Sequence, residues 1–580
     1  MKRYKILMLF VLLISICSCE DKILNLESLN EPTDASFYTN EQELNMALTG
    51  VYNSIIWKGA YLTPMQHLID NSATDIGICR GDGDAFNDLG SGIQSSMTAG
   101  LLTTYVGYYK GIALANSLLQ NMVKAKSVTP EVSYNQIKAQ ALVIRAYHYM
   151  YLTELFGDVP YLETGISTPA EGLVPRTPKS QIVDKMLVDL QNAADDLPYK
   201  WPSTQNGRIT KGVALALRAR IALYNGKFSE AVASSGAIIN NETTFGYTLN
   251  ASYKDLFQTA GQNSSEIMFV MPYMFGFATS QFSVVQGSRN LGSVSIAVPT
   301  QSMIDSYEAI DGKTIDKSAI YDPQRPFENR DPRLKASIIT PQSLWAGIIF
   351  ESHPDSLKFR LANGKIGGDN KDCRKVSWPG AFCGYLWKKY TIEENQVKIQ
   401  SWDDISFILM RYAEVLLIYA EAKIEMGQID ASVLTSINRI RARAYGVSVT
   451  NTSAYPAITA TSQAELRKVI RRERKVELAN EGFRLFDIRR WKIAEKVMPV
   501  VVYGRILDPK KATKVPTIDD DCFVSYAGVE SQYDRNTDSR FPNAQNRTFN
   551  KLRDYLLPIP QQEIDTYKGL GKTLDQNPGY

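Results

Sequence analysis

Most of the chain carries the apolar spacing of three and four residues that is typical of amphipathic α-helices. Between residues 139 and 156, small, aliphatic and aromatic side chains recur at this spacing and form one stripe along a single helical face. Gly157 and Pro160 follow at once, and both residue types end helices. Residues 185–198 repeat the pattern. The periodicity therefore predicts a mainly α-helical protein.

Residues 212–239 predict a pair of helices joined by a glycine turn. Gly226, Phe228 and Ala231 have the spacing of a tetratricopeptide-like repeat, which needs a glycine at the turn, an aromatic wedge and a small residue where the helices touch. Residues 409–444 carry a related pattern. We therefore expect tetratricopeptide-like helical hairpins that pack into a solenoid-like scaffold.

The helical periodicity is lost between residues 273 and 404. Gly, Pro, Asn and Asp separate short apolar runs there, which predicts loops, short strands and a few helices. Because long irregular segments on a rigid frame commonly carry binding sites, we expect the ligand-binding region in this part. A shorter irregular segment begins at Cys79. We divide the chain into a leader at 1–18, an N-terminal helical region at 19–270, an irregular ligand-binding insertion at 271–404 and a C-terminal helical region at 405–580 that completes the scaffold.

The first residues resemble a bacterial lipoprotein signal. Basic residues at positions 2, 3 and 5 precede an apolar run at 6–16, which is too short for a membrane span of about 20 residues. An aliphatic residue and two small ones stand before Cys19, as in the recognition site of lipoprotein signal peptidase. We expect Cys19 to become the first mature residue and to carry the lipid. The alternative is an ordinary secretory signal that contains cysteines by chance.

The composition narrows the range of partners. The 64 Lys and Arg residues nearly balance the 61 Asp and Glu residues, and no long basic block occurs, so we expect no nucleic-acid partner. Beyond the leader, no apolar stretch is long enough to cross a bilayer, so a lipid is the only membrane attachment that we expect. The remaining cysteines match no metal motif, and we interpret them as isolated buried thiols rather than disulfides: Cys79, Cys373, Cys383 and Cys522.

Signals of catalysis are few. The three histidines lie far apart, and the sequence contains no Gly-x-Ser-x-Gly elbow, phosphate loop or dinucleotide fingerprint. The acidic run at residues 81–88 contains ligands that a cation accepts, but it lacks the spacing and distal glutamate of an EF-hand, which favours a polar turn. We therefore predict no catalytic residues, no metal and no cofactor.

Residues 466–491 alternate bases with acids. The alternation cancels most of the local field, which argues against a nucleic-acid patch. Glu477 and Glu481 fall on one helical face, and Arg474 precedes Glu477 by three residues, a spacing that favours ion pairs on a helix surface. We interpret the segment as a salt-bridged helix that holds its neighbours in place.

Several motifs together resemble the RagB/SusD family of nutrient-binding outer-membrane lipoproteins of Bacteroidetes. They occur in order over nearly the whole chain, and the acidic pair after Cys19 resembles the surface-export signals of such lipoproteins. The motifs are YTNEQELNMALTGVYNSI from Tyr38, AQALVIRAYHYMYLTELFGDVPYL from Ala139, GRITKGVALALRARIAL, RDPRL at 330–334, MRYAEVLLIYAEA at 410–422, INRIRARA at 437–444, ERKVELANEGFRLFDIRRW and the ending LLPIPQQEI…LDQNPGY.

The resemblance implies a fold, a location and a partner. The expected fold is a scaffold of tetratricopeptide-like helix pairs under an irregular ligand-binding region. Such proteins have no catalytic activity and act as lids over a SusC-like TonB-dependent transporter, so we expect a lipid-anchored protein of the outer membrane that faces the cell exterior. The cargo is usually an oligosaccharide or polysaccharide. Alternatives are peptide cargo, a surface glycoside hydrolase, or a transporter stabiliser without a ligand.

Aromatic residues in the irregular segments are the candidates for glycan contact. Sugar rings lay their C–H faces on aromatic rings, while amides and carboxylates bind the hydroxyls. The sequence has 31 tyrosines and seven tryptophans, most of which we expect to pack within the fold. Phe277 is the third aromatic ring of the run PYMFGF, after Tyr273 and Phe275. The ligand-binding candidates are Phe86, Asn87, Asp88, Tyr273, Phe275 and Trp345.

Overall fold

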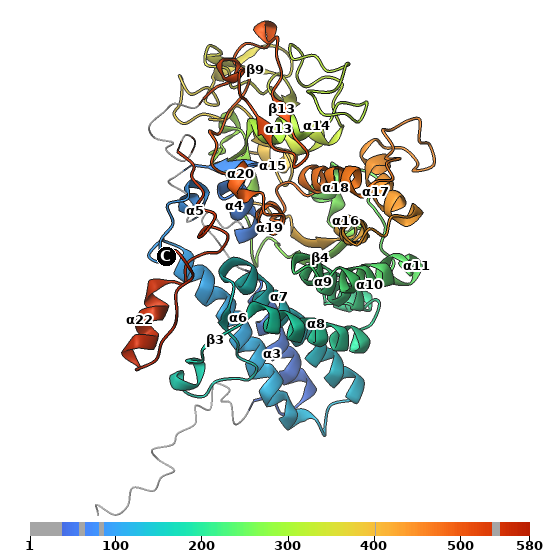
Figure 1. Cartoon of the computed structure of the whole chain (residues 1–580), viewed down its shortest axis with the longest axis vertical. Helices are drawn as coiled ribbons and strands as arrows, with labels where there is room; N and C mark the ends of the chain where they lie inside the picture. Colours follow the sequence, from blue (N-terminus) through green and yellow to red (C-terminus); the bar gives the residue numbers. More distant parts are fainter. Residues whose placement is uncertain (1–36, 57–63, 81–85, 401, 536–543, 545) are drawn as a thin grey trace, which may run out of the picture.

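A row of helices forms the lower half of the molecule (Figure 1). The computed structural model describes residues 37–56, 64–80, 86–400, 402–535, 544 and 546–580. Along the row each helix packs on the next, and the first packs on the two that follow it. The helices are α3 (Glu41–Asn53), α6 (Leu101–Asn121), α7 (Glu131–Phe156), α8 (Lys179–Asp196), α9 (Lys211–Tyr224) and α10 (Phe228–Ile239).

The hairpin of α9 and α10 shows how the sequence builds this scaffold. The turn between them needs a positive φ, which Gly226 adopts at 69° without a steric penalty. Ala231 is fully buried where the two helices meet, and Phe228 packs against the same core. The predicted mainly α-helical, tetratricopeptide-like scaffold is confirmed.

The scaffold continues across a long excursion of the chain. After α10 the chain leaves the row, and when it returns as α16 (Tyr412–Glu425) this helix packs directly on α10. The row then continues with α17 (Ala431–Ala444) and α18 (Gln463–Glu477). At the base of the excursion, β4 (Ile267–Met271) pairs antiparallel with β12 (Phe407–Arg411), so the two ends of the expected insertion lie side by side.

An irregular lobe forms the upper half of the molecule (Figure 1). Its short strands pair antiparallel, as in β1 (Gly77–Cys79) with β5 (Ala297–Pro299). Its largest sheet has the order β10-β9-β8-β7 and uses segments Ile366–Asp369, Lys358–Leu361, Ile348–Ile349 and Leu344–Trp345. Separate two-stranded sheets are formed by β11 (Leu386–Trp387) with β6 (Ile338–Ile339), and by β13 (Thr517–Ile518) with β14 (Val524–Ser525).

The C-terminal region differs from the helical one that the sequence led us to expect. After α19 (Arg484–Arg490) and the short α20 (Ala494–Val497), the chain runs mostly as loops as far as α22 (Gln561–Gly569). These loops share small cores with the insertion, in which Tyr503 and Tyr533 pack with Ile315 and Tyr321. Sequence periodicity did not reveal this shared core, because the residues that form it are far apart in the sequence.

A buried charge network joins α17 and α18 to the irregular lobe. The Glu477 carboxylate accepts hydrogen bonds from Arg411 (2.7 Å), Arg333 (3.1 Å) and Arg443. Burial opposes ionisation, but Arg443, Arg411 and Arg333 outweigh it and hold the pKa of Glu477 well below its ordinary value. Further members of the network are Glu266, Glu308, Asp331, Lys389, Arg441, Glu473 and Glu481.

The network confirms that residues 466–491 hold neighbouring segments in place, but it corrects the expected pairing. The acids do not form ion pairs on a helix surface, because Glu473, Glu477 and Glu481 are all buried. Arg474 pairs with Asp487 of α19 rather than with Glu477.

Two further expectations concern thiols and membranes. Cys79, Cys373, Cys383 and Cys522 are each buried as thiols, in agreement with their interpretation as isolated buried thiols.

Among the helices of the described ranges, none combines the length and the apolar character needed to cross a bilayer. Cys19 and the leader lie outside the described residues.

Candidate functional site

Three of the candidate aromatic rings lie in the core. Phe86 is 2% exposed, Tyr273 is 4% exposed and Trp345 is 1% exposed. Tyr273 packs edge-on against Phe282, and Trp345 belongs to a buried cluster under the ammonium group of Lys388. The prediction that these three rings are exposed platforms is wrong, because a sugar cannot reach their faces.

The polar candidates serve the local structure of their loop. Asn87 is buried, and its side-chain amide donates to the carbonyl of Arg80 at 3.2 Å. The carboxylate of Asp88 accepts from the Thr98 hydroxyl at 3.1 Å. Residues 81–85, which include most of the acidic run that we interpreted as a polar turn, lie outside the described residues. For Asn87 and Asp88 the structure therefore shows a role in fixing the loop.

Phe275 and Phe277 are the candidates that reach solvent. They are 45% and 85% exposed, and they sit on a tight turn closed by backbone hydrogen bonds between Met274 and Ala278. Gly276 at the tip has a φ of +85°, a conformation that suits glycine. The turn begins directly after β4, so the sheet at the base of the insertion holds it in position.

A tryptophan that the sequence analysis did not select lies on the neighbouring segment. Trp402 is 43% exposed and precedes Asp403, whose backbone exchanges two hydrogen bonds of 2.9 Å with Ser280. The buried Asp403 carboxylate accepts from the Ser283 backbone and hydroxyl, each at 2.7 Å. Burial raises the pKa of Asp403, although these hydrogen bonds oppose the shift. The signal in the sequence was the short run SWDD, a tryptophan beside two acids in a polar loop.

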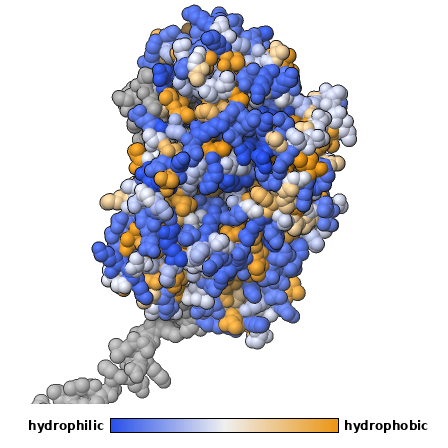
Figure 2. Space-filling model, in the orientation of Figure 1, coloured by the Kyte–Doolittle hydropathy of each residue, from blue (hydrophilic) through white to orange (hydrophobic). Residues whose placement is uncertain are grey.

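We name the exposed rings of Phe275, Phe277 and Trp402 the aromatic surface. The two segments that carry it are bonded to each other through Ser280 and Asp403. Gln400 lies beside the tryptophan, where its amide donates to the Trp402 carbonyl at 2.8 Å. Flat apolar faces next to an amide group suit a ligand that has both C–H surface and hydroxyls. On the face in Figure 2, most residues are hydrophilic and apolar ones form small separate patches.

The histidines make only structural contacts. His67 is buried with a ring nitrogen 2.9 Å from Gln286 Oε1, and His148 is buried 2.9 Å from the Ser54 hydroxyl. His353 bonds to the carbonyl of Leu507. Across the part of the chain that the structure describes, no three His, Cys, Asp or Glu side chains come together as a metal site.

Comparison with known proteins identifies the family. A model described as the SusD family matches residues 255–580, and one described as starch-binding associating with outer membrane matches residues 28–223. The chain belongs to the SusD family. A SusD-like protein from Formosa agariphila is 27% identical, and the match covers all of both chains.

Solved structures of SusD-like proteins share the fold. A SusD-like carbohydrate-binding protein from Bacteroides fragilis aligns with a TM-score of 0.76 and 25% identity, covering 91% of this chain and 98% of that one. A laminarin-binding SusD-like protein aligns with a TM-score of 0.63 and 19% identity, covering 94% of this chain and all of the other. The surface glycan-binding protein A of Bacteroides uniformis aligns with a TM-score of 0.64 and 17% identity, covering 93% of this chain and 99% of that one.

Proposed function

We propose that this SusD-family protein binds an oligosaccharide or polysaccharide at the outer surface of the outer membrane. In this proposal, a lipid on Cys19 anchors it, and it acts as the lid of a SusC-like TonB-dependent transporter. Three findings support the proposal: the family description names starch binding and the outer membrane, similar structures are described as carbohydrate-binding, and the aromatic surface suits sugars. The exposure of Phe275, Phe277 and Trp402 is the observation that carries it.

Affinity electrophoresis through gels that contain different polysaccharides tests the glycan claim. The soluble chain that starts after Cys19 is run through gels with starch, laminarin and other polymers, and retardation by one polymer measures binding. Replacing Phe275, Phe277 and Trp402 together with alanine removes three stacking faces of about 1 kcal/mol each, so affinity is expected to fall about a hundredfold.

Tyr199→Ala is the matched control, because Tyr199 is an exposed aromatic residue just after α8 of the scaffold. It is expected to leave retardation unchanged. Unchanged retardation of the triple variant would place the ligand elsewhere. Retardation by no polymer, combined with binding of peptides, would replace the glycan proposal by peptide cargo. Trp345→Ala is a poor test of binding because it removes a core ring and reports on stability.

The absence of catalysis and the partnership with a transporter need separate experiments. Incubation with the retained polymer is expected to leave its chain length unchanged, and shortening of the polymer would make the protein a hydrolase. For the partnership, the full-length protein is co-expressed with a SusC-like TonB-dependent transporter. We expect the two to co-purify from outer membranes, and a Cys19→Ala variant to be lost from the membrane fraction unless the transporter retains it.

A further inference from the structure

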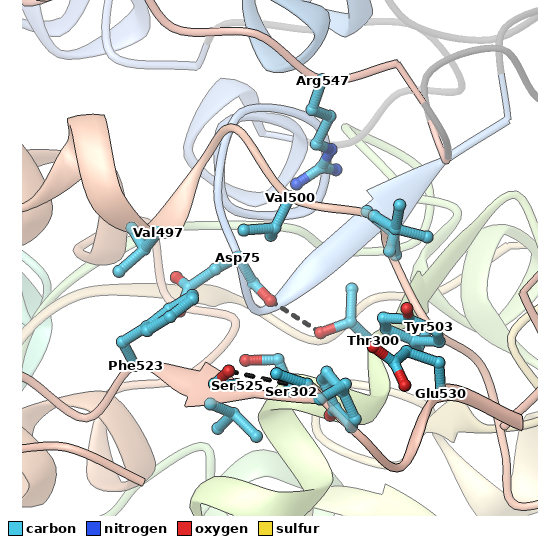
Figure 3. A pocket seen from close by; sticks show the side chains of 15 residues that line it. Asp75, Thr300, Ser302, Val497, Val500, Tyr503, Phe523, Ser525, Glu530 and Arg547 are labelled. Carbon is cyan, nitrogen blue, oxygen red and sulfur yellow. Dashed lines mark hydrogen bonds between the residues drawn. The ribbon is translucent and has the colours of Figure 1, made fainter. Parts of the chain in front are cut away.

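A compact cavity lies in the irregular lobe, formed by other segments than the aromatic surface (Figure 3). It has a volume of about 240 Å³. Its lining comes from residues 497–503, from β14 and the residues around it, and from the start of α13 (Gln301–Ser306). Arg547 and Asp75 also contribute to the lining.

Hydrogen bonds and ring packing hold the walls of the cavity in place. The Tyr503 ring packs on Tyr526 with centroids 4.5 Å apart, and the Tyr503 carbonyl accepts from the Gln301 backbone at 3.0 Å. The Tyr526 hydroxyl donates to Asp305 at 2.9 Å. On another side, the Thr300 hydroxyl donates to the Asp75 carbonyl at 2.6 Å. The cavity is therefore preformed, which lowers the entropic cost of binding.

Several polar groups in the lining keep hydrogen-bonding capacity. The Tyr503 hydroxyl has no hydrogen-bond partner among the described residues. Ser525 Oγ accepts one long bond of 3.5 Å from the Ala527 backbone. Backbone N–H groups of Glu530 and Gly528 lower the pKa of the Glu530 carboxyl, so it is ionised, and a carboxylate accepts up to about four hydrogen bonds. Ser302 adds another hydroxyl-bearing side chain.

The charges in the lining favour a neutral ligand. The lining contains an acidic residue, Glu530, beside Tyr503, and a basic residue, Arg547, in a different part of the cavity (Figure 3). Arg547 already donates to the carbonyls of Thr74 (2.7 Å) and Gly77 (3.3 Å). The Asp75 carboxylate is compensated by Arg484 at 2.7 Å. The opposite charges of Glu530 and Arg547 therefore balance, and an anionic ligand would find Arg547 already engaged by these carbonyls.

The size of the cavity suits a ligand of one ring. At about 30 Å³ per water, 240 Å³ corresponds to about eight waters, and it lies below the range of about 300–1,000 Å³ that holds drug-sized ligands. Phe523, Tyr503 and the surrounding valines offer apolar walls, while the hydroxyls and Glu530 accept hydrogen bonds. We propose that this cavity binds a single neutral sugar ring, separately from the polymer held at the aromatic surface.

Saturation-transfer NMR of the soluble chain with methyl glycosides of glucose, galactose and mannose tests this site. Three variants change the cavity with little effect on the core. Glu530→Gln removes the charged acceptor and Tyr503→Phe removes the free hydroxyl. Ala527→Trp fills the mouth from a position that is exposed, so it requires no change in the core. Phe277→Ala is the control on the aromatic surface.

We expect at least one glycoside to bind. Glu530→Gln is expected to weaken that binding about tenfold, because it replaces a charged acceptor by a neutral amide oxygen that accepts weaker hydrogen bonds. Tyr503→Phe should weaken it less, and Ala527→Trp should abolish it. Phe277→Ala should leave it unchanged. Binding by no glycoside overturns the proposal, as does binding that survives Ala527→Trp or responds only to Phe277→Ala. The polymer gels report on the aromatic surface independently, so each claim can fail alone.

Discussion

Replacing Glu477 with glutamine is the sharpest test of how the two halves of the molecule are held together. The carboxylate lies at the centre of the buried charge network and receives hydrogen bonds from Arg333, Arg411 and Arg443. Glutamine keeps the shape and one acceptor oxygen, but it presents an NH₂ group to guanidinium groups that are themselves donors. Removing one partner of a buried ion pair costs about 3–5 kcal/mol, and we expect the free energy of unfolding to fall by that amount.

Glu465→Gln is the matched control, because it makes the same substitution on the same helix. Glu465 pairs with Lys468 at 2.7 Å, but its side chain is more than half exposed. Screening by water and the loss of side-chain entropy offset the attraction within such an exposed ion pair, so we expect Glu465→Gln to have a nearly unchanged free energy of unfolding. Equilibrium unfolding in urea, followed by tryptophan fluorescence and circular dichroism, measures both variants. Equal urea midpoints for Glu477→Gln and Glu465→Gln would refute the reasoning, because they would show that the buried carboxylate contributes no more than an exposed one.

Three smaller substitutions test helix packing and proton binding. A Cβ at Gly111 would lie 2.2 Å from His148 Nε2, so Gly111→Ala is expected to destabilise the protein by about 1–3 kcal/mol in thermal melts. Gly50→Ala, which meets no neighbour, should not destabilise it, and equal melting of the two variants would contradict this packing. Burial lowers the pKa of His67 to about 4, against about 6.5 in the unfolded chain. The stability that neutral His67 contributes is therefore lost as the pH falls from about 6.5 to about 4. In this range the unfolding free energy of the wild type rises with pH, and His67→Gln should reduce that rise by up to about 1.4 kcal/mol per pH unit. Burial raises the pKa of Asp70 to about 7, against about 4 in the unfolded chain. The pH dependence is therefore opposite to that of His67: the stability that Asp70 contributes is lost as the pH rises from about 4 to 7. Asp70→Asn should therefore increase the slope of unfolding free energy against pH. If urea unfolding gave the wild-type slope for both His67→Gln and Asp70→Asn, these protonation states would be contradicted.

The scaffold was predictable from the sequence where its cause is local. The turn at Gly226, the aromatic Phe228 and the small Ala231 lie within six residues, so spacing alone identifies the hairpin. The packing of α16 on α10 was not predictable, because residues 240–411 separate the two helices and no local pattern records their contact. For the same reason, the burial of Glu477 was missed: its three arginine partners come from three distant segments, and an alternating charge run ordinarily indicates a solvated helix.

The aromatic candidates show a different limit. Trp345 and Phe275 occur in similar irregular contexts, yet one is core and the other is exposed. In β7 the chain turns Leu344 to solvent and Trp345 inward, opposite to what a binding role would need. Which face of a short strand is buried depends on the elements packed against it, and sequence periodicity over two residues cannot specify that. Trp402 was missed for a related reason, since its place beside the turn depends on a backbone pairing over more than a hundred residues.

The pairing of β4 with β12 has an evolutionary consequence. Since this pairing brings the two ends of the insertion together, and α10 meets α16 directly, the helical row does not depend on how long the intervening chain is. The entropic cost of closing a longer loop grows only slowly with its length, so a lineage can lengthen, shorten or exchange this gene segment at small cost to the frame. One condition is that the junction keeps Glu266 and Arg411, whose ion pair of 2.8 Å joins the residue before β4 to β12. A second condition is that the exchanged segment still supplies a partner such as Arg333 to the buried Glu477. Recombination at these two points offers a route to new ligands on an inherited scaffold.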